Sequence, residues 1–164
     1  DQMILRTFRA MSTLPPPLSL EQQALFPEPP AMPDVEPDIR VGFVLSPRFT
    51  LLPFASFIDS LRHAADEADF GRQIYCRWKV VAPALEPVRA SCGVEVTPHE
   101  LLPHPGEFDY LVVVGGQLPW CLDHAEETLA YLRRAYAANV SIIGLNEASA
   151  AMHDRLSGHL GAGH

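Results

Sequence analysis

Basic residues are scarce in this chain of 164 residues, which carries twelve Lys plus Arg against twenty Asp plus Glu and a net charge of −8. An acidic surface repels phosphate backbones and anionic headgroups, so we expect this segment itself to bind neither nucleic acid nor a membrane surface. The sequence also lacks an apolar run near the ~20 residues that cross a bilayer, and it lacks a signal-peptide pattern. We therefore expect a soluble, cytoplasmic protein.

Cysteine is also rare. Cys76, Cys92 and Cys121 form an odd number without a CxxC spacing, which argues against a disulfide framework and against a structural zinc site. The seven histidines include no tight ligand pair with an acidic partner. We expect free thiols, no bound metal and no cofactor.

Proline is unevenly distributed, because eight of the sixteen prolines lie in residues 1–38. Proline removes backbone donors and fixes φ, so residues 1–38 are expected to be an extended, disordered leader, with one short helix over 19–26. A proline-rich docking ligand is the functional alternative. Asp1 is not a natural start, and Met3 or Met11 could be the initiator.

From Ile39 onward, apolar strands alternate with amphipathic helices. The helix expected over 124–138 should present Leu129, Leu132 and Tyr136 to the core. The alternation predicts an α/β fold, with a doubly wound, mostly parallel sheet and helices on both faces in three layers. Strands are expected at 39–45, 75–82, 109–116 and 140–145, of which the first and the last are expected to be buried, and a hairpin is expected at 88–96. Helices are expected at 50–68 (Thr50 as N-cap, Pro53 in the first turn), 124–138 and 146–152.

Ligands of open α/β sheets bind at the carboxyl ends of the strands, and three segments of this chain end there. Glycines after a strand let the main chain approach a ligand closely, and an aromatic side chain beside them can stack on it or face an amine. A plain turn and an aromatic at the edge of the core are the structural alternatives. The candidate ligand-binding residues are Phe49, Gly115, Gly116, Trp120, Asn146 and Glu147.

The turn at Asn146 is where a nucleophile elbow would present its attacking side chain, between a strand end and a helix start. An amide cannot be ionised or activated by a base as a thiol or hydroxyl can, so acyl transfer at this turn lacks its attacking atom. We therefore assign no catalytic residue and expect no enzyme.

Five segments, in this order and spacing, carry a family resemblance: VGFVLSPRF (41–49), FASFIDSLR (54–62), VRASCGVEV (88–96), FDYLVVVGG (108–116) and IGL (143–145). Together they resemble the sensor half of GlxA-type AraC/XylS transcription regulators, within the class I glutamine amidotransferase-like, PfpI-related superfamily. The resemblance covers nearly all of 39–164 and implies a flavodoxin-like sheet.

The chain departs from that family at the elbow. Where the family commonly reads Gly-Leu-Cys-Thr-Gly, this chain reads Gly-Leu-Asn-Glu-Ala over 144–148, and the catalytic Glu and His of enzymatic members correspond to Pro53 and Glu147. The resemblance therefore implies a domain without catalysis that senses a small nitrogenous metabolite. The resemblance also implies that the domain reaches DNA only through a C-terminal helix-turn-helix domain absent from this chain.

Residues 156–164 loosely match a downstream signature of the family, so 39–164 would be a sensor domain incomplete at its C-terminus. A sheet that stops early leaves an open edge, and we expect association into a homodimer or a larger assembly. Two alternatives stay open. They are a hydrolase or amidase of the same superfamily, and a truncated product without function.

Overall fold

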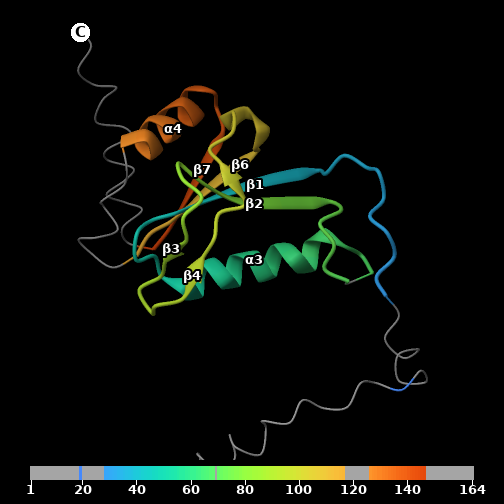
Figure 1. Cartoon of the computed structure of the whole chain (residues 1–164). Coiled ribbons are helices and arrows are strands. Elements are labelled where there is room, and N and C mark those ends of the chain that lie inside the picture. Colours follow the sequence, from blue (N-terminus) through green and yellow to red (C-terminus); the bar gives the residue numbers. More distant parts are fainter. Residues whose placement is uncertain (1–18, 20–27, 69, 117–125, 147–164) are drawn as a thin grey trace, which may run out of the picture. The chain divides into compact units, whose positions relative to one another are not determined.

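The computed structural model describes residues 19, 28–68, 70–116 and 126–146. The chain divides into two units after Ala31, and the described helices and strands belong to the second unit, from Met32 onward. Five parallel strands form one sheet in the order β5-β2-β1-β6-β7 (Figure 1), which confirms the predicted parallel α/β fold. The strands are β1 (Ile39–Leu45), β2 (Cys76–Ala82), β5 (Glu100–Leu101), β6 (Tyr110–Val114) and β7 (Ser141–Leu145).

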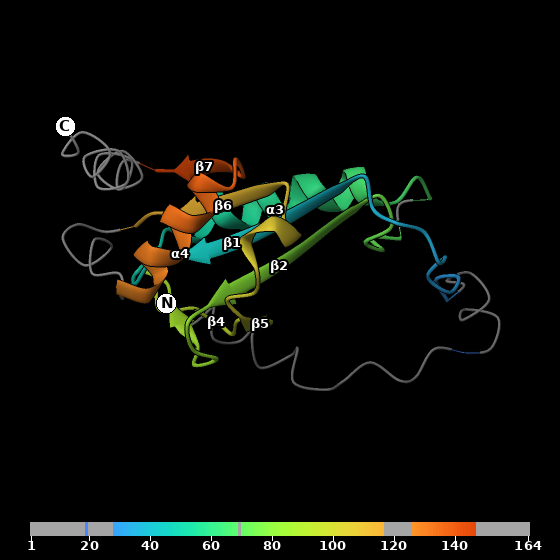
Figure 2. The ribbon, with the colours of Figure 1, turned by 90° about the horizontal axis from the view of Figure 1, so that it is seen from above.

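Helices cover both faces of the sheet. Helix α3 (Leu51–Ala65) packs on one face, while α4 (Glu126–Ala137) and the short 3-10 helix η1 (Pro105–Glu107) lie on the other (Figures 1 and 2). Strand side chains alternate between the two sides. Phe43 of β1 therefore meets the ring of Phe54 of α3 edge to face at 5.4 Å, whereas its neighbour Val44 belongs to the core beneath α4. The result is the predicted three-layer arrangement.

The predicted hairpin is present as β3 (Val88–Arg89) paired antiparallel with β4 (Glu95–Val96). Gly93 lies in its turn with φ of 92°, a conformation that favours glycine. The hairpin is attached to the loop after β1, because the Arg48 amide donates to the carbonyl of Arg89 and the Ser91 amide donates to the carbonyl of Phe49. It therefore borders the carboxyl end of the sheet.

Two predictions about the helices are wrong. Helix α3 ends at Ala65 and does not reach Ala68, because Asp66 is extended and its carboxylate accepts from the amide of Ala68 at 3.0 Å. In α4, Tyr136 is 55% exposed and the wholly buried tyrosine is Tyr131. Leu129 and Leu132 are buried as predicted, so the prediction is wrong for Tyr136 alone. Five residues at about 100° each place Tyr131 and Tyr136 some 140° apart around the helix axis, and the buried face includes Tyr131.

The sheet also differs from expectation at its two edges. Strand β7 was expected to be buried, yet its residues are half-buried or exposed, since in the described part of the chain it pairs only with β6. Strand β5 was not predicted, and it pairs in parallel with the end of β2 through Val81 and Ala82. Two residues are too short to produce a recognisable alternation of apolar and polar side chains.

Contacts with the sheet begin before β1. Pro37 is buried, the guanidinium of Arg77 donates to the carbonyl of Val35 at 2.9 Å, and Glu36 pairs with Arg40 at 2.6 Å. The helices predicted over 19–26 and 146–152 lie outside the described residues, as does Cys121. Within the described residues, no helix has the length and apolar character of a membrane span, and no three metal-ligating side chains gather.

Candidate functional site

Three chain segments meet at the carboxyl ends of β1, β6 and β7, and backbone hydrogen bonds hold them in register. The Ser46 amide donates to the carbonyl of Val114, and the Gly115 amide donates to the carbonyl of Leu145, at 3.0 and 2.9 Å. The arrowheads of β1 and β7 point in the same direction, so the two strands end at the same end of the sheet (Figure 2). The sequence thus brings its predicted site segments to one edge, where ligands of parallel sheets bind.

Asn146 directly follows β7 and has a φ of 76°. This left-handed conformation is uncommon for residues with a side chain, and Asn is among those that adopt it most readily. The sharp turn leaves the side chain exposed, and its Nδ2 donates to Oγ1 of Thr50 at 2.8 Å. The chain end of β7 therefore presents an amide side chain from a backbone in an uncommon conformation.

Thr50 connects that turn to the start of α3. It occupies the predicted N-cap position, but its hydroxyl makes no capping bond to the helix. The first turn of α3 also contains no acidic residue, so the positive end of the helix dipole is not offset by a carboxylate there. The Thr50 hydroxyl therefore lies beside the Asn146 side chain, at the positive end of the α3 dipole.

The two glycines predicted to face a ligand have different roles. Gly115 is buried, its amide is bonded to Leu145, and its carbonyl accepts from the amide of Thr50 at 3.0 Å, so its backbone is used within the fold. Gly116 forms a bridge with Phe49, and a Cβ there would overlap the carbonyl group of Arg48. Of the pair, Gly116 is the one that is partly exposed.

Phe49 contributes to this end of the sheet through its backbone. Its side chain is wholly buried, and its ring meets that of Phe54 edge to face at 5.5 Å. The preceding Arg48 has a φ of 56°, which turns the chain sharply so that Phe49 enters the core. The buried ring of Phe49 therefore anchors the loop after β1 to the core.

Cysteine and histidine side chains, which are usual in acyl transfer, occur on several elements in the described part of the chain. Cys76 is buried at the start of β2, where burial raises the pKa of its thiol, and Cys92 is exposed on the β3–β4 hairpin. His99 accepts from the amide of Val80 through Nδ1, and His104 caps η1, so both histidines have structural partners. The group that the structure places on the Asn146 side chain is the Thr50 hydroxyl, and the Cys92 thiol lies on the hairpin that borders this end of the sheet.

Trp120 and Glu147, the remaining predicted site residues, lie outside the described residues. The side chain that sequence reasoning missed is the hydroxyl of Thr50, which was interpreted as a helix cap. A partner 96 positions away in the sequence leaves no local signal. Only the parallel arrangement of β1 and β7, on either side of β6, brings Thr50 and Asn146 together.

No protein-family model matches the sequence, and no curated protein matches it. Solved structures do match its fold. A DJ-1 superfamily protein from Agrobacterium tumefaciens is 20% identical with a TM-score of 0.56, over 73% of this chain and 58% of that protein. A ThiJ/PfpI family protein from Pseudomonas syringae is 22% identical with a TM-score of 0.51, over 74% and 51%.

An AraC family transcriptional regulator from Pseudomonas putida is similar to the same extent, at 23% identity and a TM-score of 0.57 over 73% of this chain and 61% of that structure. The chain thus spans between half and two thirds of these three structures. Identities this low establish the fold alone. The described sheet and helices have the α/β fold that is shared by DJ-1/ThiJ/PfpI superfamily proteins and by an AraC family regulator.

Proposed function

We propose that this domain senses a small nitrogenous metabolite in the crevice at the carboxyl ends of β1, β6 and β7, and that it does so without catalysis. The observation that carries the proposal is the amide of Asn146. Asn146 has a φ of 76° at the turn after β7, and a hydrogen bond of 2.8 Å to Thr50 orients its side chain. An oriented amide without a nucleophile is suited to recognition.

The chemistry of the crevice supports a ligand that contains nitrogen. Nδ2 of Asn146 donates to Thr50, and Oδ1 is the acceptor group of that side chain, whose chemistry matches an amine or amide N–H. The Thr50 hydroxyl accepts from Asn146 and keeps its own proton to donate. In the proposal, Gly116 and the segment of Phe49 form one side of the crevice, and Trp120 and Glu147 complete it.

The wider context is proposed from the fold and the family resemblance. An AraC family regulator has this fold, so we assign the domain to a cytoplasmic regulator of that kind, of the GlxA type. Ligand occupancy would act on DNA through a helix-turn-helix domain beyond this segment, in a homodimer or larger assembly. With a net charge of −8, the segment alone is expected to give no mobility shift with duplex DNA, even at low salt.

The test is ligand binding by the full chain. A panel of small amines, amides and amino acids is screened by thermal shift, and hits are measured by calorimetry. Asn146→Gly should weaken a hit by about tenfold, because it removes the amide and keeps the backbone turn. Asn139→Gly is the matched control, since Asn139 has a φ of 59° after α4, away from the crevice.

A panel without hits, or a hit bound equally by Asn146→Gly and the control, would contradict the sensing proposal. The turn at Asn146, directly after β7, also supports one competing function, that of a hydrolase or amidase of the superfamily. Ester or amide turnover that persists through purification and disappears in Asn146→Gly would favour that alternative. We expect no turnover above buffer.

A further inference from the structure

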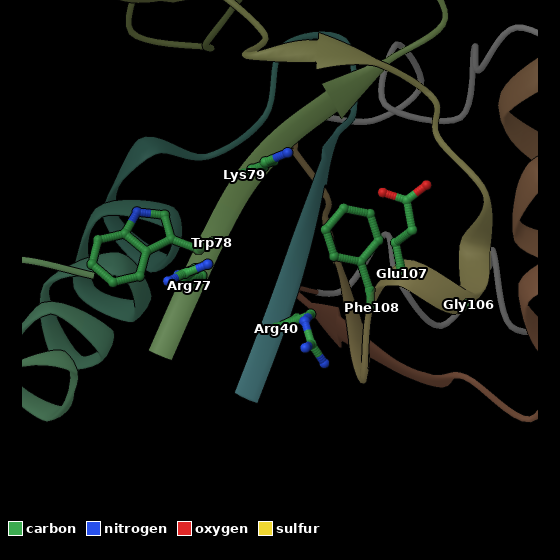
Figure 3. Close-up of a pocket in the computed structure, with 7 residues that line it drawn as sticks. All are labelled: Arg40, Arg77, Trp78, Lys79, Gly106, Glu107 and Phe108. Carbon is green, nitrogen blue, oxygen red and sulfur yellow. The ribbon is translucent and has the colours of Figure 1, made fainter. Parts of the chain in front are cut away.

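A hollow lies near the opposite end of the sheet from Asn146. It has a volume of about 400 Å3 and opens beside η1, near the starts of β1 and β2 (Figure 3). Arg40, Arg77, Lys79, Glu107 and Phe108 are among its lining residues. Arg40 and Ser46 are six strand residues apart, roughly 20 Å at about 3.3 Å per residue, so the two sites are separate.

Strand register brings the basic side chains of the hollow together. Arg40 of β1 pairs with Arg77 of β2, and Gly42 pairs with Lys79 in the same ladder. Because side chains alternate along a strand, all three cations lie on the face of the sheet that carries α4. Three of the twelve basic residues of an acidic chain, including its only lysine, thus line one hollow.

Phe108 forms the opposite wall, and a glycine makes its position possible. A Cβ at Gly42 would lie 3.0 Å from the ring of Phe108 and 2.6 Å from Leu111, so only glycine lets that ring lie close against β1. Figure 3 shows Phe108 and Glu107 on the side of the hollow that faces the three cations. The hollow is therefore basic on its sheet side and contains one acidic group at η1.

The three cations differ in how their charge is balanced. Arg40 pairs with Glu36, whose side chain is 87% exposed, and Lys79 pairs with Glu100 at 2.8 Å. Arg77 instead donates to the backbone carbonyls of Gln73 and Val35, at 3.3 and 2.9 Å. In the described part of the chain Arg77 has no carboxylate partner, so its full charge is available to an incoming anion.

We propose that this hollow binds a small oxyanion, a carboxylate or phosphate group, between Arg77 and Arg40. Guanidinium groups match the geometry of both oxyanions, and the exposed Glu36 is a weak competitor for Arg40 because surface ion pairs contribute little. Glu107 repels an anion, so the anionic group lies at the arginine end. The less polar remainder of the ligand lies toward Phe108.

The test is a titration of the full-length chain, labelled with nitrogen-15, with inorganic phosphate and separately with malonate, at ionic strength held constant with chloride. We expect saturable shifts of the amides that begin β1 and β2 and of the Arg77 side chain. Saturation by phosphate alone, malonate alone or both supports the proposal and identifies the group. Shifts that stay proportional to concentration for both probes, or that centre on Asn146, overturn it.

Three variants sharpen the result. Arg77→Gln should weaken binding by about tenfold or more, because it removes charge-assisted hydrogen bonds. Arg62→Gln makes the same change in charge on α3, where Arg62 pairs with Asp59, and should leave affinity unchanged. If Arg77→Gln does not fold, the binding measurement is made with Glu107→Gln.

This variant removes the negative charge that repels an anion, keeps a side-chain oxygen for the cap of η1, and should tighten anion binding. Equal affinity of Arg77→Gln and Arg62→Gln, or no tightening by Glu107→Gln, overturns the proposal.

Discussion

Gly116 lies so close to the backbone of Arg48 that a side chain on it would overlap the carbonyl group of Arg48 and lie 2.5 Å from Cα of Phe49. Replacement of Gly116 by alanine must therefore separate the loop after β1 from the end of β6. We expect Gly116→Ala to lower the free energy of unfolding by at least about 1–3 kcal/mol, the usual cost of overpacking. Urea denaturation measures this change.

Gly106→Ala is the control for that experiment. A Cβ on Gly106 would meet only the ring of His104, at 3.2 Å, and this exposed side chain can move aside at the cost of the one hydrogen bond by which it caps η1. We expect a much smaller loss of stability from this variant. If both variants were equally stable, the bridge between Phe49 and Gly116 would not be the close contact described above.

The Asn146–Thr50 hydrogen bond should appear as a coupling energy. A double-mutant cycle with Asn146→Gly and Thr50→Val should give about 0.5–1.5 kcal/mol, the net contribution of one hydrogen bond. Asn146→Ala should be less stable than Asn146→Gly, because alanine is strained at a φ of 76°. Additive single variants in denaturant unfolding would contradict the predicted coupling.

Asp66 should make the fold sensitive to acid. A hydrogen bond from Arg72, helped by the amide of Ala68, lowers the pKa of the Asp66 carboxyl from 3.8 to about 2, against the opposing effect of burial. Because this folded-state pKa lies below the ordinary value, the ionised carboxylate stabilises the fold fully above pH 3.8. That contribution is lost as the pH falls toward about 2.

Unfolding measured across this pH range should therefore show a steeper loss of stability in the parent chain than in Asp66→Asn. Asp59→Asn is the control. Asp59 also pairs with an arginine, Arg62, but its side chain is 64% exposed, so its ion pair is screened by solvent. A parallel pH dependence of the parent chain and Asp66→Asn would show that the Asp66–Arg72 pair does not control acid stability.

The outer edge of β7 should promote association. Ile142, Ile143 and Leu145 are half-buried there, and the described residues provide no further strand beside them. Such an edge can pair with a second copy of the chain, and a lysine on it disfavours that pairing. We expect light scattering to show dimers or larger species of the parent chain, and Ser141→Lys to shift them toward monomer. A parent chain that stays monomeric at high concentration would contradict this prediction.

The regular part of the fold was predictable because its signals are local. The β-branched run of β6 and the apolar spacing of α3 each identify an element without reference to the rest of the chain. The choice of buried tyrosine in α4 was not predictable from the spacing of its apolar residues. Tyr131 and Tyr136 are both large and aromatic, and only the position of the helix on the sheet decides which of them is buried. The exposure of β7 depends likewise on its place at the sheet edge.

The location of the candidate site was predictable for a different reason. Parallel strands place their carboxyl ends at one edge, so the segments after β1, β6 and β7 had to converge. The hydrogen-bond partners at this end of the sheet were not predictable, because a long stretch of chain separates Thr50 from Asn146. The basic hollow was missed for the same reason, since Arg40 and Arg77 become neighbours only through the pairing of β1 with β2.

The position of β1 between β2 and β6 also has a consequence for the order of folding. Only α3 and the chain after it separate β1 from β2, whereas β1 must wait for Tyr110–Val114 before its other side is paired. Closing a longer loop costs more entropy, so the β1–α3–β2 unit should form first. Until β6 has been synthesised and pairs with β1, the backbone of β1 on that side is an unpaired edge of an apolar strand. During synthesis this interval is therefore the one most open to aggregation.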